Sequence, residues 1–209
     1  MRHSPYILAI LVGLTTTALS AAEPEEGFTS LFDDKTLEGW EGDAKSFRVE
    51  NGAIVAGTLK AAIPRNEFLC TKKTYENFEL RLQVKLVPAS GNAGIQFRTK
   101  RVPNNHEVSG YQADVGEGWW GKLYDEHRRN KVLAGDDNKL GDKLKKEDWN
   151  DYVIRAEGNR IQLWVNGVAT VDYTEADAAI AKSGVIGVQI HGGAACEASY
   201  RNIRIKELK

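Results

Sequence analysis

The chain has 209 residues, with 28 lysines and arginines against 29 aspartates and glutamates. This near-neutral balance argues against nucleic acid as the partner, because phosphate binding needs clustered cations. The length favours one domain, and it is sufficient for a stable core without disulfides or metals.

The first 22 residues have the composition of a secretory signal peptide. Arg2 precedes an apolar run over residues 6–14, and the small residues Ser20 and Ala22 fit a cleavage site. The apolar run is too short to cross a bilayer. We therefore predict a secreted or periplasmic mature chain that starts near Glu23, has no membrane span and forms a single domain over residues 23–209. An uncleaved N-terminal anchor helix is the alternative.

Alternation of apolar and polar residues with a period of two dominates the mature chain and predicts β-strands. In residues 78–86 every second residue is apolar, beginning with Phe78 and ending with Leu86. The same alternation recurs in five further segments, 93–100, 110–116, 151–173, 184–193 and 198–208. Many antiparallel strands joined by Gly and Asn turns indicate an all-β sandwich or jelly roll.

Turn and helix signals divide the strands. Within residues 151–173, Gly158-Asn159 and then Asn166-Gly167 predict two hairpin turns, because these residues tolerate positive φ. Residues 173–184 could form one short turn of helix that ends at Gly184. The charged segment 136–149 reads as a solvated loop.

Two cysteines, Cys70 and Cys196, lie at the edges of predicted strands. An oxidising compartment permits a disulfide between them. The alternative, two separate buried thiols, has equal support.

Three pairs of polar residues are spaced two apart, so each pair shares one face of its strand: Gln96 with Arg98, Gln112 with Asp114, and Gln189 with His191. Glycines flank them, and glycine within a strand often marks the close approach of a ligand. Their amide, guanidinium, carboxylate and imidazole groups suit the hydroxyls of a sugar. By contrast, the polar face of residues 78–86 is a solvated sheet face.

His191 precedes two glycines at the end of a predicted strand. Because imidazole exchanges protons near neutral pH, His191 is a candidate base. His106 lies in a turn-rich loop and is expected at the surface.

The stretch from Gly110 to Asn130 concentrates rings, acids and bases. Trp119 and Trp120 can stack on sugar rings, although one of them is expected to plug the end of a sheet. In the segment that follows, Tyr124 and Glu126 are candidate acids and Arg128 is a candidate substrate ligand. Some of the neighbouring acids and arginines, among them Asp125 and Arg129, are expected to form structural ion pairs.

Several common catalytic motifs are absent from the sequence. It contains no Gly-x-Ser-x-Gly, HExxH, CxxC or P-loop motif. His127, His191 and nearby acids are candidate ligands for a divalent metal, although their spacing in the sequence matches no recognisable metal-binding motif.

The segments of the mature chain, in their order, resemble the 3-keto-disaccharide hydrolase domain family. The matching pieces are SLFDDKTLEGW, FRVENGAIVAG, YENFELRLQVKL, GNAGIQFR, SGYQADVG, WWGKLYD, EDWNDYVIRAEGNRIQLWVNG, GVIGVQIHGG and YRNIRIKEL. The resemblance implies a concanavalin A-like jelly roll with a sugar cleft on its concave sheet. It also implies hydrolysis of glycosides oxidised at C3, through removal of the C2 proton and elimination, then addition of water.

The sequence departs from the family pattern at one place. Family members show Glu, a small apolar residue and Gln after Gly-Tyr, whereas this chain has Gln112, Ala113 and Asp114. The carboxylate is displaced by two residues and stays on the same strand face. His191 or Asp114 is then the expected base, and an upstream sugar oxidoreductase is an expected functional neighbour. The alternatives are a non-catalytic carbohydrate-binding module on the same fold and a structural envelope protein.

Overall fold

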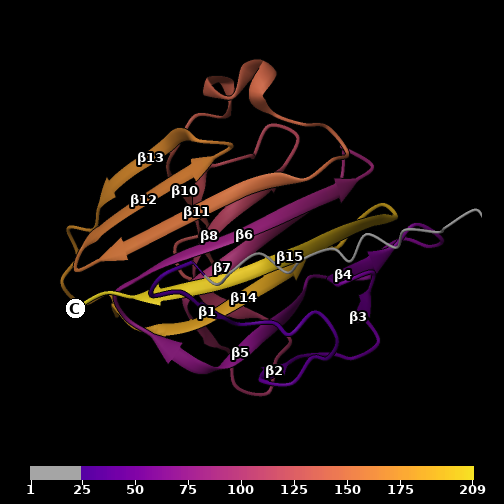
Figure 1. The fold of residues 1–209 in the computed structure, drawn as a ribbon, viewed down its shortest axis with the longest axis horizontal. Coiled ribbons are helices and arrows are strands. Elements are labelled where there is room, and N and C mark those ends of the chain that lie inside the picture. Colours follow the sequence, from indigo (N-terminus) through magenta and orange to yellow (C-terminus); the bar gives the residue numbers. More distant parts are fainter. Residues whose placement is uncertain (1–24) are drawn as a thin grey trace, which may run out of the picture.

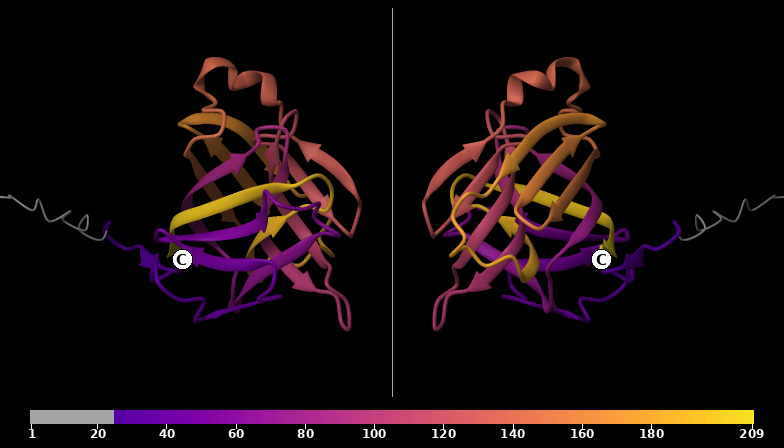
Figure 2. Two further views of the ribbon diagram at one scale, coloured as in Figure 1. Left: turned by 90° about the vertical axis from the view of Figure 1, so that its right-hand side faces the viewer. Right: turned by 90° about the vertical axis from the view of Figure 1, so that its left-hand side faces the viewer.

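The computed structural model describes residues 25–209. The predicted signal peptide over residues 1–22 lies outside the described residues. Two antiparallel sheets pack face to face (Figure 1), and Figure 2 shows the same sandwich from two sides. The predicted all-β sandwich is confirmed.

The two sheets have the following strand orders. The first sheet runs β13 (Val168–Thr174), β12 (Arg160–Val165), β11 (Asn150–Glu157), β6 (Phe78–Val87), β15 (Cys196–Glu207), β4 (Ala53–Thr58), β3 (Phe47–Glu50), with β1 (Thr29–Ser30) paired to β15. The second sheet runs β10 (Lys131–Ala134), β9 (Leu123–Glu126), β8 (Val108–Gly116), β7 (Asn92–Arg101), β14 (Gly184–Ile190), β5 (Glu67–Tyr75), β2 (Trp40–Glu41).

The core lies between the sheets and follows the predicted alternation. In β6 every second residue, from Phe78 to Leu86, is buried, and the intervening polar residues are partly exposed. The inner face of the second sheet contributes its own apolar residues, namely Ala93, Ile95 and Phe97 from β7, Tyr111, Ala113 and Val115 from β8, and Ile186, Val188 and Ile190 from β14. Burial of these two facing sets is the main force that holds the sheets together.

Both predicted hairpin turns are present. One joins β11 to β12 across Gly158 and Asn159, and the other joins β12 to β13 across Asn166 and Gly167. Asn166 and Gly167 have φ of 48° and 79°, the positive values that a two-residue hairpin favours.

Two local predictions need correction. Residues 175–183 contain no helix: Tyr173 and Thr174 belong to β13, and the segment after it is held to the sheet through Glu175, which accepts hydrogen bonds from Tyr111 and Arg129. The charged segment 136–149 is not only loop. It holds two short 3-10 helices, Asp137–Lys139 and Gly141–Lys143, the first capped by the side chain of Asp136.

The disulfide alternative is wrong. Cys70 and Cys196 are both buried and free, and they belong to different sheets. Cys70 faces Gly187 across the β5–β14 pair, and burial raises the pKa of its thiol to about 11. Both cysteines therefore act as small buried residues.

The outer face of the second sheet is the unusual surface of the molecule. Outer faces of antiparallel sheets are commonly solvated. Here the polar side chains of Gln96, Gln112, Asp114 and Gln189 point outward from three adjacent strands, yet each is at most 3% exposed. Polar groups that are buried this deeply need partners, and their partners define the site.

Candidate active site

Seven residues line a pocket of about 120 Å³ on the outer face of the second sheet: Asn92, Gln112, Asp114, Trp119, Tyr124, Glu126 and His191. They come from β7, β8 and β9, from the loop between β8 and β9, and from the residue that follows β14. All but Asn92 are residues that the sequence nominated. Pairing of β8 with both β7 and β9 brings them together.

A chain of hydrogen bonds orients the carboxyl group of Asp114. Thr99 Oγ1 donates to Gln96 Oε1 over 3.3 Å, Gln96 Nε2 donates to Gln112 Oε1, and Gln112 Nε2 donates to Asp114 Oδ1 over 2.5 Å. Gly94 makes room for this chain, since a Cβ there would overlap the Gln112 side chain. Gln96 thus lies behind the pocket and supports Gln112.

The second oxygen of Asp114 is left free. Oδ2 is buried and has no hydrogen-bond partner among residues 25–209. Burial raises the pKa of Asp114 to about 8, the hydrogen bond from Gln112 opposes this, and the charge of Glu126 adds to it. At neutral pH the carboxyl group therefore holds a proton that no described side chain accepts.

Glu126 and Tyr124 also have raised pKa values. Burial is the main cause for both, with the charge of Glu107 adding for Glu126 and that of Glu126 adding for Tyr124. The charges of His191 and His127 oppose the shift at Glu126. The pocket thus gathers acids that keep their protons at higher pH than usual, which is common at catalytic sites.

His191 stands exposed at the mouth of the pocket. Its Nδ1 lies 2.6 Å from the carbonyl oxygen of Gly192. Because a carbonyl only accepts, Nδ1 carries a proton in this contact. In that tautomer the lone pair lies on Nε2, the ring nitrogen through which His191 can accept a proton.

The two adjacent tryptophans have opposite surroundings. Trp119 is 39% exposed, lines the pocket, and packs edge-on against Tyr124 with ring centroids 6.2 Å apart. Trp120 is buried and stacks on Tyr152. The Tyr152 hydroxyl accepts from the Gly121 amide and donates to the Asp114 carbonyl, so it anchors the loop that presents Trp119.

Strand alternation places Asp125 on the face of β9 opposite to Tyr124 and Glu126. Tyr124 and Glu126 point from β9 into the pocket, while Asp125 points inward and is fully buried. Asp125 accepts hydrogen bonds from Arg128 Nε at 2.8 Å and from Arg129 Nε. Asp125, Arg128 and Arg129 therefore form a structural cluster, and Arg128 lies over the Tyr111 ring rather than in the pocket.

Arg98 also lies outside the pocket. The register of the β7–β8 pair shifts between Phe97 and Lys100, and Arg98 adopts a φ of 47°. This β-bulge breaks the alternation that would have placed Arg98 beside Gln96. Its guanidinium instead donates to Glu76 O and Gly158 O at 2.9 and 2.8 Å and ties together two turns.

Gln189 adjoins the pocket from β14. It is fully buried, its Nε2 lies 3.4 Å from Glu126 Oε2, and its Oε1 has no partner within the described chain.

The sequence interpretation missed Asn92, although Asn92, Gly94 and Gln96 are spaced two apart and share one face of β7. That spacing was the available signal.

The described residues show neither a cluster of metal ligands nor a helix that could span a membrane. Among residues 25–209, no group of three or more His, Cys, Asp or Glu side chains is placed to hold a metal ion. The same residues include no helix of the length and apolarity that a membrane crossing requires.

Comparisons with known proteins agree with this fold. The profile of the 3-keto-alpha-glucoside-1,2-lyase-like domain matches residues 27–206. A protein from Parabacteroides distasonis, assigned as a glycosyl hydrolase, superposes with a TM-score of 0.67 at 19% identity, over 88% of this chain and 95% of that one. A carbohydrate-binding module from Bacillus subtilis superposes with a TM-score of 0.59 at 12% identity, over 81% of this chain and 96% of the module. The β-glucanase of Bacillus licheniformis superposes with a TM-score of 0.56 at 11% identity, over 87% of this chain and 97% of the glucanase. No curated protein sequence matches significantly.

Proposed function

The chain belongs to the 3-keto-alpha-glucoside-1,2-lyase-like domain family, and from this premise we propose that it cleaves glycosides whose sugar carries a ketone at C3. Membership and the jelly-roll neighbours support a carbohydrate-active hydrolase-like or carbohydrate-binding protein. The observation that carries the catalytic proposal is Asp114, whose buried Oδ2 has no described partner and whose pKa of about 8 keeps it protonated at neutral pH.

In the proposed reaction, the C3 ketone acidifies the hydrogen on C2. Nε2 of His191 removes this proton, and the electrons of the C2–H bond form an enolate. The enolate oxygen accepts a hydrogen bond from the protonated Asp114, which stabilises the charge as it develops. Asp114 thus serves as the oxyanion partner and His191 as the base.

The leaving group departs in the second half of the reaction. As the enolate collapses, the bond between C1 and the leaving oxygen breaks, and Glu126 or Tyr124 protonates that oxygen. Water then bonds to C1 and gives one of its protons back to the deprotonated Glu126 or Tyr124, while the proton held by His191 returns to C2. The sum is hydrolysis with the ketone retained, and no pair of carboxylates at a fixed glycosidase spacing is needed.

Binding in this proposal uses the remaining pocket groups. Trp119 packs its exposed ring on the sugar, Gln112 hydrogen-bonds a hydroxyl, and the unpartnered Oε1 of Gln189 accepts another. Arg98 and Arg128 take no part, since each is held in a structural contact. The substrate must come from a reaction that oxidises a C3 hydroxyl, so a sugar oxidoreductase is the proposed functional neighbour.

We expect the protein to release a chromogenic leaving group from a 3-keto glucoside and not from the same glucoside with its C3 hydroxyl intact. Elimination requires the ketone, whereas ordinary glycoside hydrolysis does not. Deuterium at C2 is expected to slow release, and His191→Ala is expected to lower kcat by at least about 100-fold. A parallel assay with a chelator tests for a divalent metal.

Two outcomes would contradict this proposal in different ways. Cleavage of both glucosides at similar rates would replace elimination with direct glycoside hydrolysis. Binding of 3-keto sugars with no release would leave a carbohydrate-binding module.

We also propose that the protein is exported, on the basis of the signal-peptide pattern in residues 1–22. The expected result is an exported chain whose mass corresponds to a start at Glu23. Intact-mass spectrometry of the extracytoplasmic fraction tests this, and an exported chain that retains Met1 would contradict cleavage.

A further inference from the structure

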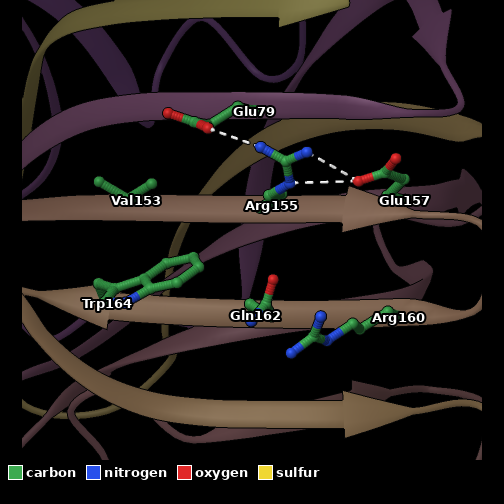
Figure 3. Close-up of a pocket in the computed structure, with 7 residues that line it drawn as sticks. All are labelled: Glu79, Val153, Arg155, Glu157, Arg160, Gln162 and Trp164. Atoms are coloured by element: carbon green, nitrogen blue, oxygen red, sulfur yellow. Dashed lines mark hydrogen bonds and ion pairs between the residues drawn. The ribbon is translucent and has the colours of Figure 1, made fainter. Parts of the chain in front are cut away.

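A second hollow lies on the outer face of the first sheet. Its volume is about 670 Å³, and Figure 3 shows the seven residues that line it: Glu79 from β6, Val153, Arg155 and Glu157 from β11, and Arg160, Gln162 and Trp164 from β12. The two sheets pack through their inner faces, so this hollow and the candidate active site open on opposite sides of the sandwich. The catalytic proposal uses none of its residues.

Trp164 is the feature that separates this hollow from an ordinary wet sheet face. It is partly exposed, and across the β11–β12 pair it faces Val153, so the two form an apolar floor. Trp149, close to the start of β11, shows how a tryptophan is covered elsewhere in the protein. Arg201 lies 3.9 Å and Lys85 5.2 Å from the Trp149 ring centroid. Within the described chain, no cation or second ring lies over Trp164.

The charges around Trp164 neutralise one another. Arg155 Nη2 lies 2.8 Å from Glu157 Oε2, and its Nη1 lies 3.4 Å from Glu79 Oε2. Arg160 Nη2 lies 2.6 Å from Asp172 Oδ2. Paired charges of this kind offer no net positive field, so the hollow does not suit a phosphate, a nucleic acid or an anionic lipid surface.

The same groups suit a neutral ligand that is rich in hydroxyls. Along β12, Trp164, Gln162 and Arg160 follow one another at two-residue spacing on one face (Figure 3). Two residues of strand span about 7 Å, so the row extends over ~13 Å. Gln162 uses its Nε2 on Asp172 at 3.3 Å, and its Oε1 has no protein partner among residues 25–209.

We propose that this hollow is a second carbohydrate-binding site, which holds a neutral polysaccharide chain along β12. The ring of Trp164 packs against the apolar face of one sugar, and Gln162 and Arg160 hydrogen-bond the hydroxyls of the next. The site anchors the protein on a polymer while the pocket on the opposite sheet remains open. It does not depend on the reaction that the pocket catalyses.

The experiment measures retardation of the full mature chain in native gels that contain a soluble β-glucan, a dextran or a mannan. We expect at least one polymer to retard the wild-type protein. Trp164→Ala is expected to weaken that binding about tenfold or more, and Gln162→Ala several-fold. Trp149→Ala is the matched control, because it removes the same ring from the same sheet face and is expected to bind as wild type does. Thermal melts confirm that each variant is folded.

Three results would overturn the proposal. Absence of retardation by all three polymers is the first. Binding that Trp164→Ala leaves intact, and that Trp119→Ala abolishes, would assign the polymer to the candidate active site. A wild-type dimer that Trp164→Ala dissociates in sedimentation would make the hollow a contact between two copies of the chain. Cleavage of the small chromogenic 3-keto glucoside is measured in parallel, and its absence alone does not bear on this second site.

Discussion

Replacing Asp114 with asparagine is expected to lower kcat/KM on a 3-keto glucoside by at least about 10-fold, less than the roughly 10²- to 10³-fold cost of removing an oxyanion donor altogether. The substitution keeps the shape of the side chain, and its amide oxygen can still accept the hydrogen bond from Gln112 Nε2. At the position of Oδ2 the acidic O–H is replaced by an amide N–H, which is a weaker hydrogen-bond donor to an oxyanion. Asp151→Asn is the matched control, because Asp151 is an exposed carboxylate on the first sheet that accepts from Gln83 Nε2 at 2.8 Å.

The pH dependence of the proposed activity tests the role of Asp114. Its pKa of about 8 means that the proton is present below pH 8 and lost above it. If Asp114 donates to the enolate, kcat/KM falls as the pH rises through 8, and this fall is absent in Asp114→Asn. A wild-type kcat/KM that instead rises through pH 8 would make Asp114 the base and contradict the assignment to His191.

The same substitution is expected to stabilise the fold at alkaline pH. An aspartate in an unfolded chain has a pKa of about 3.9, whereas folded Asp114 has a pKa of about 8. Between these values the folded state binds one more proton than the unfolded state. The free energy of unfolding therefore falls as the pH rises from 4 to 8 and stays reduced above 8.

Asparagine carries no such penalty, so Asp114→Asn is expected to be more stable than wild type at pH 9 by a few kcal/mol, or roughly 5 °C or more in Tm. Near pH 4 the two proteins are expected to melt alike. Thermal melts at both pH values test this, and an equal difference at pH 4 and pH 9 would show that the carboxyl group is not buried with its proton. A less active variant that is more stable would mark Asp114 as a residue that serves function at the expense of the fold.

Asp125→Ala is expected to lower the free energy of unfolding by about 3–5 kcal/mol, which corresponds to about 10 °C in Tm. Asp125 is fully buried and is the shared acceptor of Arg128 and Arg129. Without it, two partly buried guanidinium groups lose their common partner. Urea unfolding measures the change.

The cluster around Asp125 extends to the end of β13. Arg129 Nη2 also donates to Glu175 Oε2 at 2.7 Å, and the Tyr111 hydroxyl donates to the same oxygen at 2.7 Å. Burial acts to raise the pKa of Glu175, but the hydrogen bonds from Arg129 and Tyr111 bring it down to about 2. The cluster thus ties β8 and β9 to the segment after β13.

The exposed pair Arg160–Asp172 is the control for this prediction. Asp172→Ala removes an ion pair of similar length, 2.6 Å, whose two side chains are both more than half exposed. It is expected to cost no more than about 1 kcal/mol. Equal losses for Asp125→Ala and Asp172→Ala would show that burial of the Asp125 cluster contributes nothing.

The sequence by itself determined the fold class and most of the candidate site. A period of two assigns each residue to one of two faces, and burial of one face specifies the register. Once Tyr111, Ala113 and Val115 are recognised as core, Gln112 and Asp114 must point the other way. The same rule places Tyr124 and Glu126 together and sends Asp125 to the opposite side. Asn92 lay within reach of that rule and was overlooked.

Only the tertiary structure decided the features that the alternation of strand faces does not predict. A single bulge after Phe97 removed Arg98 from the face of Gln96, because one extra residue breaks the alternation. The contrast between Trp119 and Trp120 depends on Tyr152, which lies far away in sequence and near in space. The protonation of Asp114 likewise depends on its burial and on Glu126 and Gln112 beside it. Desolvation and charge act through distance in three dimensions, and a strand pattern carries no information on how deeply its outward face is covered.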